Sequence, residues 1–472
     1  MARVDSTIMR TKFRGDLVYP GHPRYDDLRS VFNQMIDQHP AIIARCGTPS
    51  DVAATIQFAR DSGMPLSVYG GGHGVTGTAV CDGIVADLRP MKDIVIDQNA
   101  RSARAGAGLT WGEFDAATQR HGLAVTGGRV SSTGVAGLIL GSGSGWLERK
   151  LGYTADNLIS VEMVTADGEI VTASQQENAD LFWGTRGGGG NFGAVTAFDL
   201  RLHPVGPTVL GGMLIYPADL GPAVLTAFGE FFAQAPDEVG GAVALITAPP
   251  APFVPDALQG RPAVGMVLTY AGAVEDGERV LRPLREFGPP AADMIEPMPY
   301  TQLQQMINPA NPAGLRNYWS AGFLRELSGD VIETLCAQHL AAPSPFSQIL
   351  VIPGGGAVAR VPDDRMAFGQ RQAPFNVHVL SMWTDWAEDS GNIAWARRVS
   401  ASLGPFVTGR VYLNYVADQG EDRVRSAYGP EAYARLQELK DRYDPQNLFR
   451  SNQNIRPSAG PAGSAPPPPR RG

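Results

Sequence analysis

Three short segments of the 472-residue chain are rich in glycine, and one of them carries a lone histidine. Residues 70–77 read Gly-Gly-Gly-His-Gly-Val-Thr-Gly, with the imidazole at His73, and glycines gather again at 127–145 and 187–193. Closely spaced glycines let consecutive backbone N–H groups point into one concavity, a geometry that binds a pyrophosphate. A flexible linker is the alternative, but linkers are rich in serine and charge, whereas these glycines flank strand-like apolar runs. The segments therefore predict the walls of a site for a phosphorylated cofactor with a ring system.

The motifs of the common nucleotide sites are missing from these loops. The first loop lacks the Lys-Ser/Thr ending of a P-loop, and no G-x-G-x-x-G joins a strand to a helix with an acid about 20 residues later. The sequence therefore favours neither NTP hydrolysis nor a Rossmann unit. The three cysteines, Cys46, Cys81 and Cys336, show no metal-ligand spacing, so we expect no metal site and no disulfide framework.

Composition narrows the class of partner and the location. Hydrophobic residues make up 43% and charged residues 18%, which is typical of a globular protein. The net charge of −8, without a basic stripe, argues against nucleic-acid binding. No apolar run of about 18 residues is available to span a membrane, and residues 1–19 lack the apolar core of a secretory signal. We expect a cytoplasmic monomer or homodimer that does not bind membranes.

The elements that must position the glycine segments follow from local signals. Thr48-Pro49-Ser50-Asp51 and Thr110-Trp111-Gly112-Glu113 both have the pattern of a helix N-terminus. An irregular N-terminal arm is expected to end in a helix near Leu28–Ile36. Strands are predicted at residues 42–45, 66–69, 84–88, 94–97, 103–106, 158–165, 170–173 and 194–202, with helices at 48–63, 110–122 and 178–183.

Beyond residue 207 the pattern changes to apolar strands separated by proline-rich links. Strands are predicted at 242–246, 263–270, 348–352, 375–382 and 409–415, and helices at 223–233, 279–287 and 431–443. Residues 459–472 read AGPAGSAPPPPRRG, a low-complexity composition typical of a disordered tail.

The chain resembles a known family over most of residues 38–207 and again near its end. The matching text includes GGGHG, TGVAGLILGSGSGWLERKLG, ADNLISVEMVTADGEIVTAS, ENADLFWGTRGGGGNFGAVTAFDLRLHPVG, GGAVARVPDD, YLNY and DPQNLFRSNQNI. It is similar to the FAD-linked oxidases of the berberine-bridge-enzyme and vanillyl-alcohol-oxidase superfamily, in the branch of the enterocin-type oxygenase and the 6-hydroxynicotine oxidases. The match is specific for fold and cofactor and unspecific for substrate.

The resemblance implies an α+β fold in which a two-part, PCMH-type FAD-binding domain is joined to a substrate domain built on an antiparallel sheet covered by helices. The implied division is an N-terminal arm at 1–37, the FAD domain at 38–207, the substrate domain at 208–408, a segment at 409–458 that returns to the FAD domain, and the tail at 459–472.

The same resemblance assigns the cofactor contacts. His73 stands where the family's histidine bonds the flavin 8α-methyl group, so FAD is expected to be covalently held. Val130 stands where many relatives have a second linking cysteine, so we expect a single link. The further cofactor contacts are Gly70, Gly71, Gly72, Gly74, Gly77, Gly128, Ser132, Thr133, Gly134, Gly137, Leu138, Gly141, Gly143, Gly145, Trp146, Asn157, Gly193, Val195, Asn414, Asn452 and Asn454.

The catalytic assignments are less direct. Thr133 stands at the position that lines the oxygen side of the flavin in the family, although it is also suited to capping the next helix. Tyr412 and Asn414 would share one face of the predicted strand at 409–415, with Tyr415 opposite. Tyr412 would then polarise a substrate hydroxyl or accept its proton, and the alternative is that both are core strand residues. Some relatives carry an acid where this chain has Leu350 and Ile352; His378 is the substitute base, with a buried core histidine as the alternative.

These residues predict an oxidase that transfers hydride from a small organic substrate, such as a secondary metabolite, to FAD and then electrons to O2. An oxygenase that uses an oxygenated flavin N5 is the first alternative, and a flavin-binding protein without turnover is the second.

Overall fold

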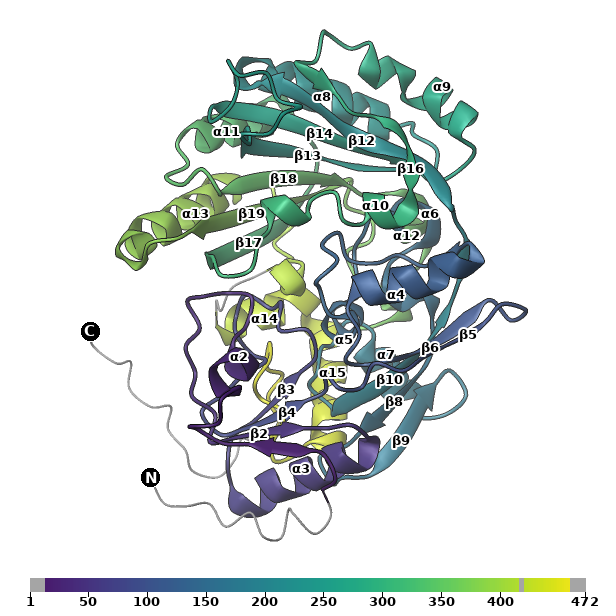
Figure 1. The fold of residues 1–472 in the computed structure, drawn as a ribbon, viewed down its shortest axis with the longest axis vertical. Coiled ribbons are helices and arrows are strands. Elements are labelled where there is room, and N and C mark those ends of the chain that lie inside the picture. Colours follow the sequence, from purple (N-terminus) through teal and green to yellow (C-terminus); the bar gives the residue numbers. More distant parts are fainter. Residues whose placement is uncertain (1–12, 416–419, 459–472) are drawn as a thin grey trace.

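The computed structural model describes residues 13–415 and 420–458, which form two lobes (Figure 1). The first lobe holds the elements up to residue 204 together with the C-terminal helices, and the second lobe holds the large sheet at the top of the view. In this part of the chain no helix is long and apolar enough to cross a membrane. The predicted tail at 459–472 lies outside the described residues.

The first lobe contains a mixed sheet in the order β1-β2-β4-β3, formed by β1 (Asp16–Val18), β2 (Ile42–Arg45), β4 (Ile84–Asp87) and β3 (Leu66–Tyr69). Strands β2 and β3 both pair parallel to β4, and helix α3 (Pro49–Ser62) connects β2 to β3. The Thr48 hydroxyl accepts a hydrogen bond from the Asp51 amide while the Asp51 carboxylate accepts from the Thr48 amide, and α3 ends at Gly63 in the left-handed conformation. The helix signals in the sequence are thus confirmed.

A second, antiparallel sheet completes this lobe. Its order is β5 (Ile94–Asp97), β6 (Ser102–Gly106), β10 (Ala194–Arg201), β8 (Leu158–Val164) and β9 (Ile170–Ser174). The remaining elements are α2 (Tyr25–Arg29), α4 (Trp111–Thr118), β7 (Leu123–Ala124), α5 (Val135–Leu140), α6 (Glu148–Leu151), α7 (Ala179–Thr185), β11 (His203–Pro204), α14 (Glu421–Tyr428) and α15 (Pro430–Tyr443).

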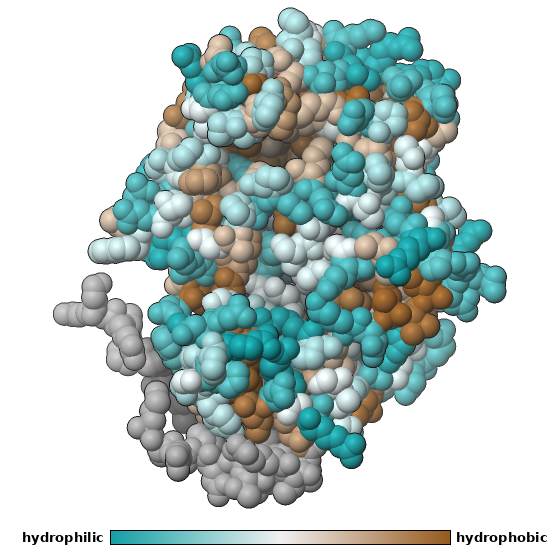
Figure 2. Space-filling model, in the orientation of Figure 1, coloured by the Kyte–Doolittle hydropathy of each residue, from teal (hydrophilic) through white to brown (hydrophobic). Residues whose placement is uncertain are grey.

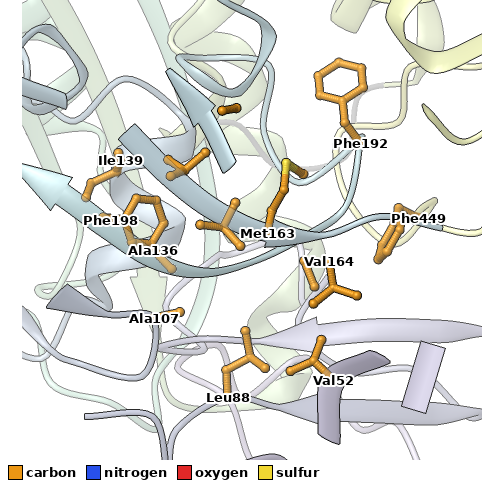
Figure 3. Close-up of a cluster of buried hydrophobic side chains, with 14 of the residues drawn as sticks. Val52, Leu88, Ala107, Ala136, Ile139, Met163, Val164, Phe192, Phe198 and Phe449 are labelled. Atoms are coloured by element: carbon orange, nitrogen blue, oxygen red, sulfur yellow. The ribbon is translucent and has the colours of Figure 1, made fainter. Parts of the chain in front are cut away.

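The core of the first lobe joins its two sheets and the C-terminal segment (Figure 3). Met163 and Val164 on β8 and Phe198 on β10 are almost fully buried, and Ala136 and Ile139 bring one face of α5 into the same cluster. Val52, Leu88, Ala107, Phe192 and Phe449 extend it. Because α5 lies directly after a glycine segment, this packing fixes where that segment runs.

The second lobe is built on an antiparallel sheet that, among the described residues, has eight strands. Its strands are β15 (Ala292–Asp293), β12 (Thr208–Pro217), β14 (Pro262–Tyr270), β13 (Val239–Thr247), β18 (Gln348–Pro353), β19 (Phe375–Trp383) and β17 (Arg316–Leu324) in that order, with β16 (Glu296–Pro299) beside β12.

Helices cover the outer face of this sheet: α8 (Gly221–Phe232), α9 (Val274–Arg285), α11 (Gly329–Leu340) and α13 (Asp389–Leu403). Phe228, Leu335 and Trp395 are buried against strand residues in one hydrophobic cluster. The opposite face turns toward the first lobe, where α10 (Tyr300–Leu303), α6 and α12 (Gly356–Arg360) lie (Figure 1). The predicted class, an antiparallel sheet covered by helices beside a two-part α+β lobe, is confirmed.

Two predicted elements are wrong. The helix expected near Leu28–Ile36 is absent, since α2 ends at Arg29. The backbone that follows bonds to both lobes instead of to itself, through Phe32 to the Gly72 carbonyl and through Gln34 to the Leu315 carbonyl. The strand expected at 409–415 has no neighbouring strand to pair with; it is an irregular segment ending in a 3₁₀ turn, Leu413–Tyr415. Strands β12 and β17 and helices α11 and α13 were not anticipated from the sequence.

The surface mixes polar and apolar residues, and hydrophobic residues reach it in separate patches (Figure 2). The most exposed large apolar side chains are Val95 on β5, Leu340 at the end of α11 and Trp386 after β19, on different elements.

A buried carboxyl group links the lobes. Asp115 on α4 is 1% exposed, and its Oδ2 accepts a hydrogen bond of 2.9 Å from Nε2 of Gln304, the residue after α10. Within the described chain its Oδ1 has no hydrogen-bond partner. Burial raises the pKa of Asp115 to about 7, with the Gln304 hydrogen bond opposing the shift. The neutral carboxyl group is therefore the form that this interface accommodates.

Stability should consequently fall as pH rises from about 4 to about 7 and then level off. The unfolded Asp115, with a pKa of 3.8, releases its proton far earlier than the folded one, so the native state loses up to about 4 kcal/mol between the two pKa values. Urea unfolding between about pH 4 and pH 7 should show this decline in the parent protein and a weaker decline in Asp115→Asn. Identical pH profiles for the two proteins would refute the assignment.

Candidate functional site

A cavity lies between the lobes, with glycine segments on one side and apolar strand residues on the other. The first lobe contributes parts of all three glycine segments, and the second contributes Trp319 from β17, Leu350 and Ile352 from β18, and Leu380 from β19. These four strand residues lie on one face of the sheet, since Trp319 pairs with Leu380 and Leu350 pairs with His378, two residues before Leu380.

The first two glycine segments touch backbone to backbone. A Cβ atom on Gly71 would lie 2.4 Å from the Cα and N of Gly134, and one on Gly134 would lie 2.6 Å from the Cα of Gly71. No side chain fits at either position, because real Cβ contacts are never so short. This close approach places the His73 loop beside the start of α5.

His73 follows that contact directly and lines the cavity. Its imidazole stacks on the ring of Phe32, with 3.9 Å between centroids, and its Nε2 is buried without a hydrogen-bond partner among the residues described. Burial lowers the pKa of His73 to about 4, with a hydrogen bond to its own backbone opposing the shift. The ring is therefore neutral at physiological pH, the form in which an imidazole nitrogen is nucleophilic.

The third glycine segment is held in place by the C-terminal part of the chain. Lys440 on α15 is fully buried and donates to the carbonyls of Asn191 and Phe449, both at 2.9 Å, and to the carboxylate of Asp444 at 2.7 Å. The Asn191 side chain in turn accepts from the amide of Ile455. Residues 451–453 are thereby brought into the cavity wall beside Gly189, Gly190 and Gly193.

Most of the cofactor contacts expected from the sequence line this cavity. They are Gly70, Gly71, Gly72, His73, Gly74, Gly128, Thr133, Gly134, Gly137, Leu138, Gly141, Gly193, Val195, Asn414 and Asn452. Val130 lies in the wall as well. Thr133 does not cap α5, since the N-cap residue is Gly134 and no side chain caps the helix.

Other expected residues lie outside the wall: Gly77, Ser132, Gly143, Gly145, Trp146, Asn157, Asn454, Tyr412 and His378. The glycines among them are needed for packing, since a Cβ on Gly145 would collide with the Gly127 carbonyl and one on Gly143 with Thr154. Asn157 is engaged inside the first lobe, where it donates to the carbonyls of Leu151 and Tyr153.

The two tyrosines of the YLNY motif exchange the positions expected for them. The Tyr412 side chain is fully buried and its hydroxyl oxygen accepts hydrogen bonds from the amides of Gly143 and Ser144, at 3.0 and 2.9 Å. Tyr415 instead lines the cavity. The reason is the 3₁₀ turn at Leu413–Tyr415, which breaks the strand alternation on which the prediction was based.

His378 lies behind Tyr415. The two rings stack with 3.9 Å between centroids, and neither ring nitrogen of His378 has a hydrogen-bond partner within the described residues. Burial, and secondarily the nearby Arg129, lower the pKa of His378 well below its ordinary value, so the ring is neutral. Its surroundings match the buried-histidine interpretation better than a direct contact with substrate.

Arg129 is a cavity residue that the sequence reasoning missed. Its guanidinium is 5% exposed, donates to the Ser144 hydroxyl at 2.8 Å and forms an ion pair of 3.2 Å with Glu148. Burial raises the pKa of Tyr415, whereas Arg129 opposes that rise through its charge and a hydrogen bond. The only sequence signal was a single arginine inside the second glycine segment.

The residues of this cavity fit an FAD molecule. Gly71 and Gly134 leave bare backbone at the cavity wall. Two groups in the wall, His73 Nε2 and the Oδ1 atom of Asn452, are buried without partners in the part of the chain described, so they are free to contact the cofactor. Among the same residues no group of three or more His, Cys, Asp or Glu side chains is arranged to hold a metal ion.

Comparison with known proteins agrees with this geometry. Residues 40–174 match the "FAD binding domain" family and residues 411–456 match the "Berberine and berberine like" family. An FAD-linked oxidoreductase of Dictyostelium discoideum is 32% identical over 423 residues, which cover 89% of each chain. (R)-6-hydroxynicotine oxidase of Paenarthrobacter nicotinovorans is 29% identical, over 94% of this chain and 97% of the relative.

Solved structures have the same fold. The crystal structure of 6-hydroxy-D-nicotine oxidase from Arthrobacter nicotinovorans has a TM-score of 0.84 at 28% identity and covers 94% of this chain and 98% of its own. A BBE-like protein of Physcomitrella patens has the same TM-score at 21% identity, over 93% and 96% of the two chains.

Fold and site together define an FAD-dependent oxidoreductase. The chain belongs to the berberine-bridge-enzyme-like family of FAD-linked oxidoreductases, within the wider vanillyl-alcohol-oxidase group.

The contact between the glycine segments can be tested by adding one methyl group. Gly71→Ala should lower the free energy of unfolding by about 1–3 kcal/mol or more and reduce the FAD bound per chain, because the backbone of Gly134 must move. Gly391→Ala is the control, since a Cβ there meets no atom within 4 Å and the position is helical. That control should gain up to about 1 kcal/mol. A Gly71→Ala protein with unchanged stability and FAD content would contradict the contact.

Proposed function

We propose that this protein is an oxidase that holds FAD covalently through His73, removes a hydride and a proton from a small organic molecule, and passes the electrons to O2. The observation that carries the proposal is the neutral imidazole of His73 in the wall of the glycine-lined cavity, whose Nε2 has no hydrogen-bond partner among the described residues. When bound, the flavin supplies the two-electron acceptor that O2 reoxidises.

A single covalent link follows from the wall. Val130 lines the cavity at the position expected for a second linking cysteine, and its side chain has no thiol to form the bond. The chain's cysteines are elsewhere: Cys46 is buried, and Cys81 and Cys336 are partly buried and do not line the cavity. His73 is thus the nucleophilic side chain proposed for the attachment.

The substrate side of the cavity selects for apolar, flat molecules. Trp319, Leu350, Ile352 and Leu380 present hydrocarbon and indole surface, and the rings of Trp319 and Tyr415 lie nearly parallel, 5.8 Å between centroids. A charged substrate would lose its hydration against these side chains without compensation. An aromatic alcohol, phenol or cyclic amine in its neutral form is the class we propose, in keeping with a secondary metabolite.

Tyr415 is the residue proposed to take the substrate proton. It is the tyrosine of the YLNY motif that reaches the cavity. Burial raises the pKa of its phenol, and the Arg129 guanidinium beside it opposes that rise by charge and by a hydrogen bond. His378, stacked beneath the ring, fixes its plane, while Tyr412 holds the Gly143–Ser144 amides that precede Glu148. In this arrangement Glu148 orients Arg129.

The alternatives differ in the fate of oxygen and in turnover. An oxygenase would insert oxygen into the product and would not release stoichiometric hydrogen peroxide. Thr133, which lines the cavity, is the residue that supports this alternative. A flavin-binding protein without turnover would keep its yellow colour with every reducing substrate offered. We propose a cytoplasmic enzyme that acts as a monomer or homodimer.

Acid denaturation tests the covalent link. The purified protein should keep its yellow colour in the acid precipitate, and peptide mapping should place the flavin on His73. His73→Ala should release all flavin into the supernatant, whereas His22→Ala, which changes an exposed histidine of the same lobe, should leave it bound. Flavin released from the parent protein, or retained by His73→Ala, would contradict the proposal.

The two tyrosines provide a matched pair for the catalytic assignment. Tyr415→Phe should slow anaerobic bleaching of the flavin by (R)-6-hydroxynicotine or a panel of benzylic alcohols by roughly 10²–10⁴-fold, because the proton acceptor is lost. Tyr412→Phe should bleach much closer to the parental rate but lose about 1–3 kcal/mol of stability, since two buried amides lose their acceptor. Equal bleaching rates in Tyr415→Phe and the parent protein would refute the role of Tyr415.

A further inference from the structure

We propose that Phe32, a residue of the segment that crosses between the lobes, is a positioning residue for covalent attachment of the flavin. It acts by fixing the plane of the His73 imidazole. This inference rests on the proposed covalent link and adds a residue to it that lies outside the glycine segments and does not line the cavity.

The contact is a stack of two flat rings. The ring centroids of Phe32 and His73 are 3.9 Å apart and their planes differ by 18°. The backbone follows the same path, because the Phe32 amide donates to the carbonyl of Gly72 at 2.9 Å. Gly72 and Gly74 have no side chains that could restrict the imidazole, so its orientation depends on the Phe32 stack and on the hydrogen bond to the His73 backbone. The Phe32 face therefore determines how the ring is turned.

Phe32 is itself held from both lobes. Its neighbour Asn33 is 2% exposed and donates through Nδ2 to the carbonyls of Val75, at 2.8 Å, and Asn317, at 3.0 Å. The Asn33 Oδ1 accepts from the Asn317 amide at 2.9 Å. Trp319 adds an edge-on contact with the Phe32 ring, 5.8 Å between centroids. The orientation of His73 is thus fixed only when the two lobes are assembled.

The stack also leaves one nitrogen available. The imidazole bonds to the backbone of His73 itself, while Nε2 is buried and without a partner among the described residues. Attachment joins the flavin methyl carbon to that nitrogen, and the methyl group loses one hydrogen and the imidazole one proton. The electron pair reduces the flavin, and O2 accepts it to give hydrogen peroxide. In this step the apolar Phe32 ring orients the imidazole and takes no part in proton transfer.

A simple packing role for Phe32 predicts a different result. Phe32 is 6% exposed and packs with Val75, Leu315 and Trp319, so its removal would also cost stability. Leucine keeps an apolar side chain at this position but offers no flat face, and tyrosine keeps the face. Comparison of Phe32→Leu with Phe32→Tyr therefore separates packing from ring orientation.

The experiment measures the rate of covalent labelling in the full chain. Flavin-free protein would be prepared from cells limited for riboflavin and mixed with FAD in air, and samples would be denatured in acid over time to count the flavin that remains on the polypeptide. Phe32→Leu should bind FAD but acquire the bond about tenfold to a hundredfold more slowly than the parent, because a misplaced nucleophile loses the benefit of orientation. Phe32→Tyr should restore the parental rate.

Phe13→Leu is the matched control, since Phe13 is 8% exposed, lies on the same N-terminal stretch and packs in a different cluster. It should label at the parental rate. Labelling of Phe32→Leu at the parental rate, or failure of Phe32→Tyr to restore that rate, would overturn the role of Phe32 and leave the covalent link intact. Complete release of flavin from the parent protein would overturn both.

Discussion

The approach of Gly71 to Gly134 is the contact on which the rest of the site depends. Two loops separated by more than sixty residues meet with no side chain between them. A side chain on either glycine would collide with the backbone of the other. The contact places the His73 imidazole at the start of α5, whose buried face is anchored in the core shared by both sheets of the first lobe. A displacement of α5 would therefore displace the proposed attachment point.

The remaining wall is held by polar groups that are fully removed from water. Lys440 and Asp444 form a buried pair whose other hydrogen bonds go to the backbone of the third glycine segment and of the C-terminal segment. Such a pair is stable only while all its partners are present. It makes the C-terminal segment part of the first lobe, although the whole second lobe separates the two in sequence.

The division of labour between the lobes explains why relatives with one fold act on different molecules. The first lobe contributes the glycine segments, His73 and polar side chains such as Arg129 and Asn452, whereas the second contributes side chains from one sheet face, which can change without disturbing the strand pairing. In this chain those strand side chains are aliphatic and aromatic, and polar side chains such as Arg129, Tyr415 and Asn311 line other parts of the wall. In the proposed function, shape and hydrophobicity would select the substrate, while Arg129 and Tyr415 would provide the chemistry.

The sequence by itself determined the features that depend on neighbouring residues. The capped start of α3, the glycine loops and the hairpin of β8 and β9 follow from local rules, and the family resemblance extends over the same segments. Only the tertiary structure decided which glycines face the cavity, because Gly141 and Gly143 belong to the same glycine segment and differ in their three-dimensional partners. It likewise decided that Tyr415, and not Tyr412, reaches the cavity, since alternation applies only to a strand that has a partner. The stack of Phe32 on His73 is supported by the hydrogen bond between Asn33 and Asn317, which are some 280 residues apart. Sequence periodicity gives no information about contacts over such a separation.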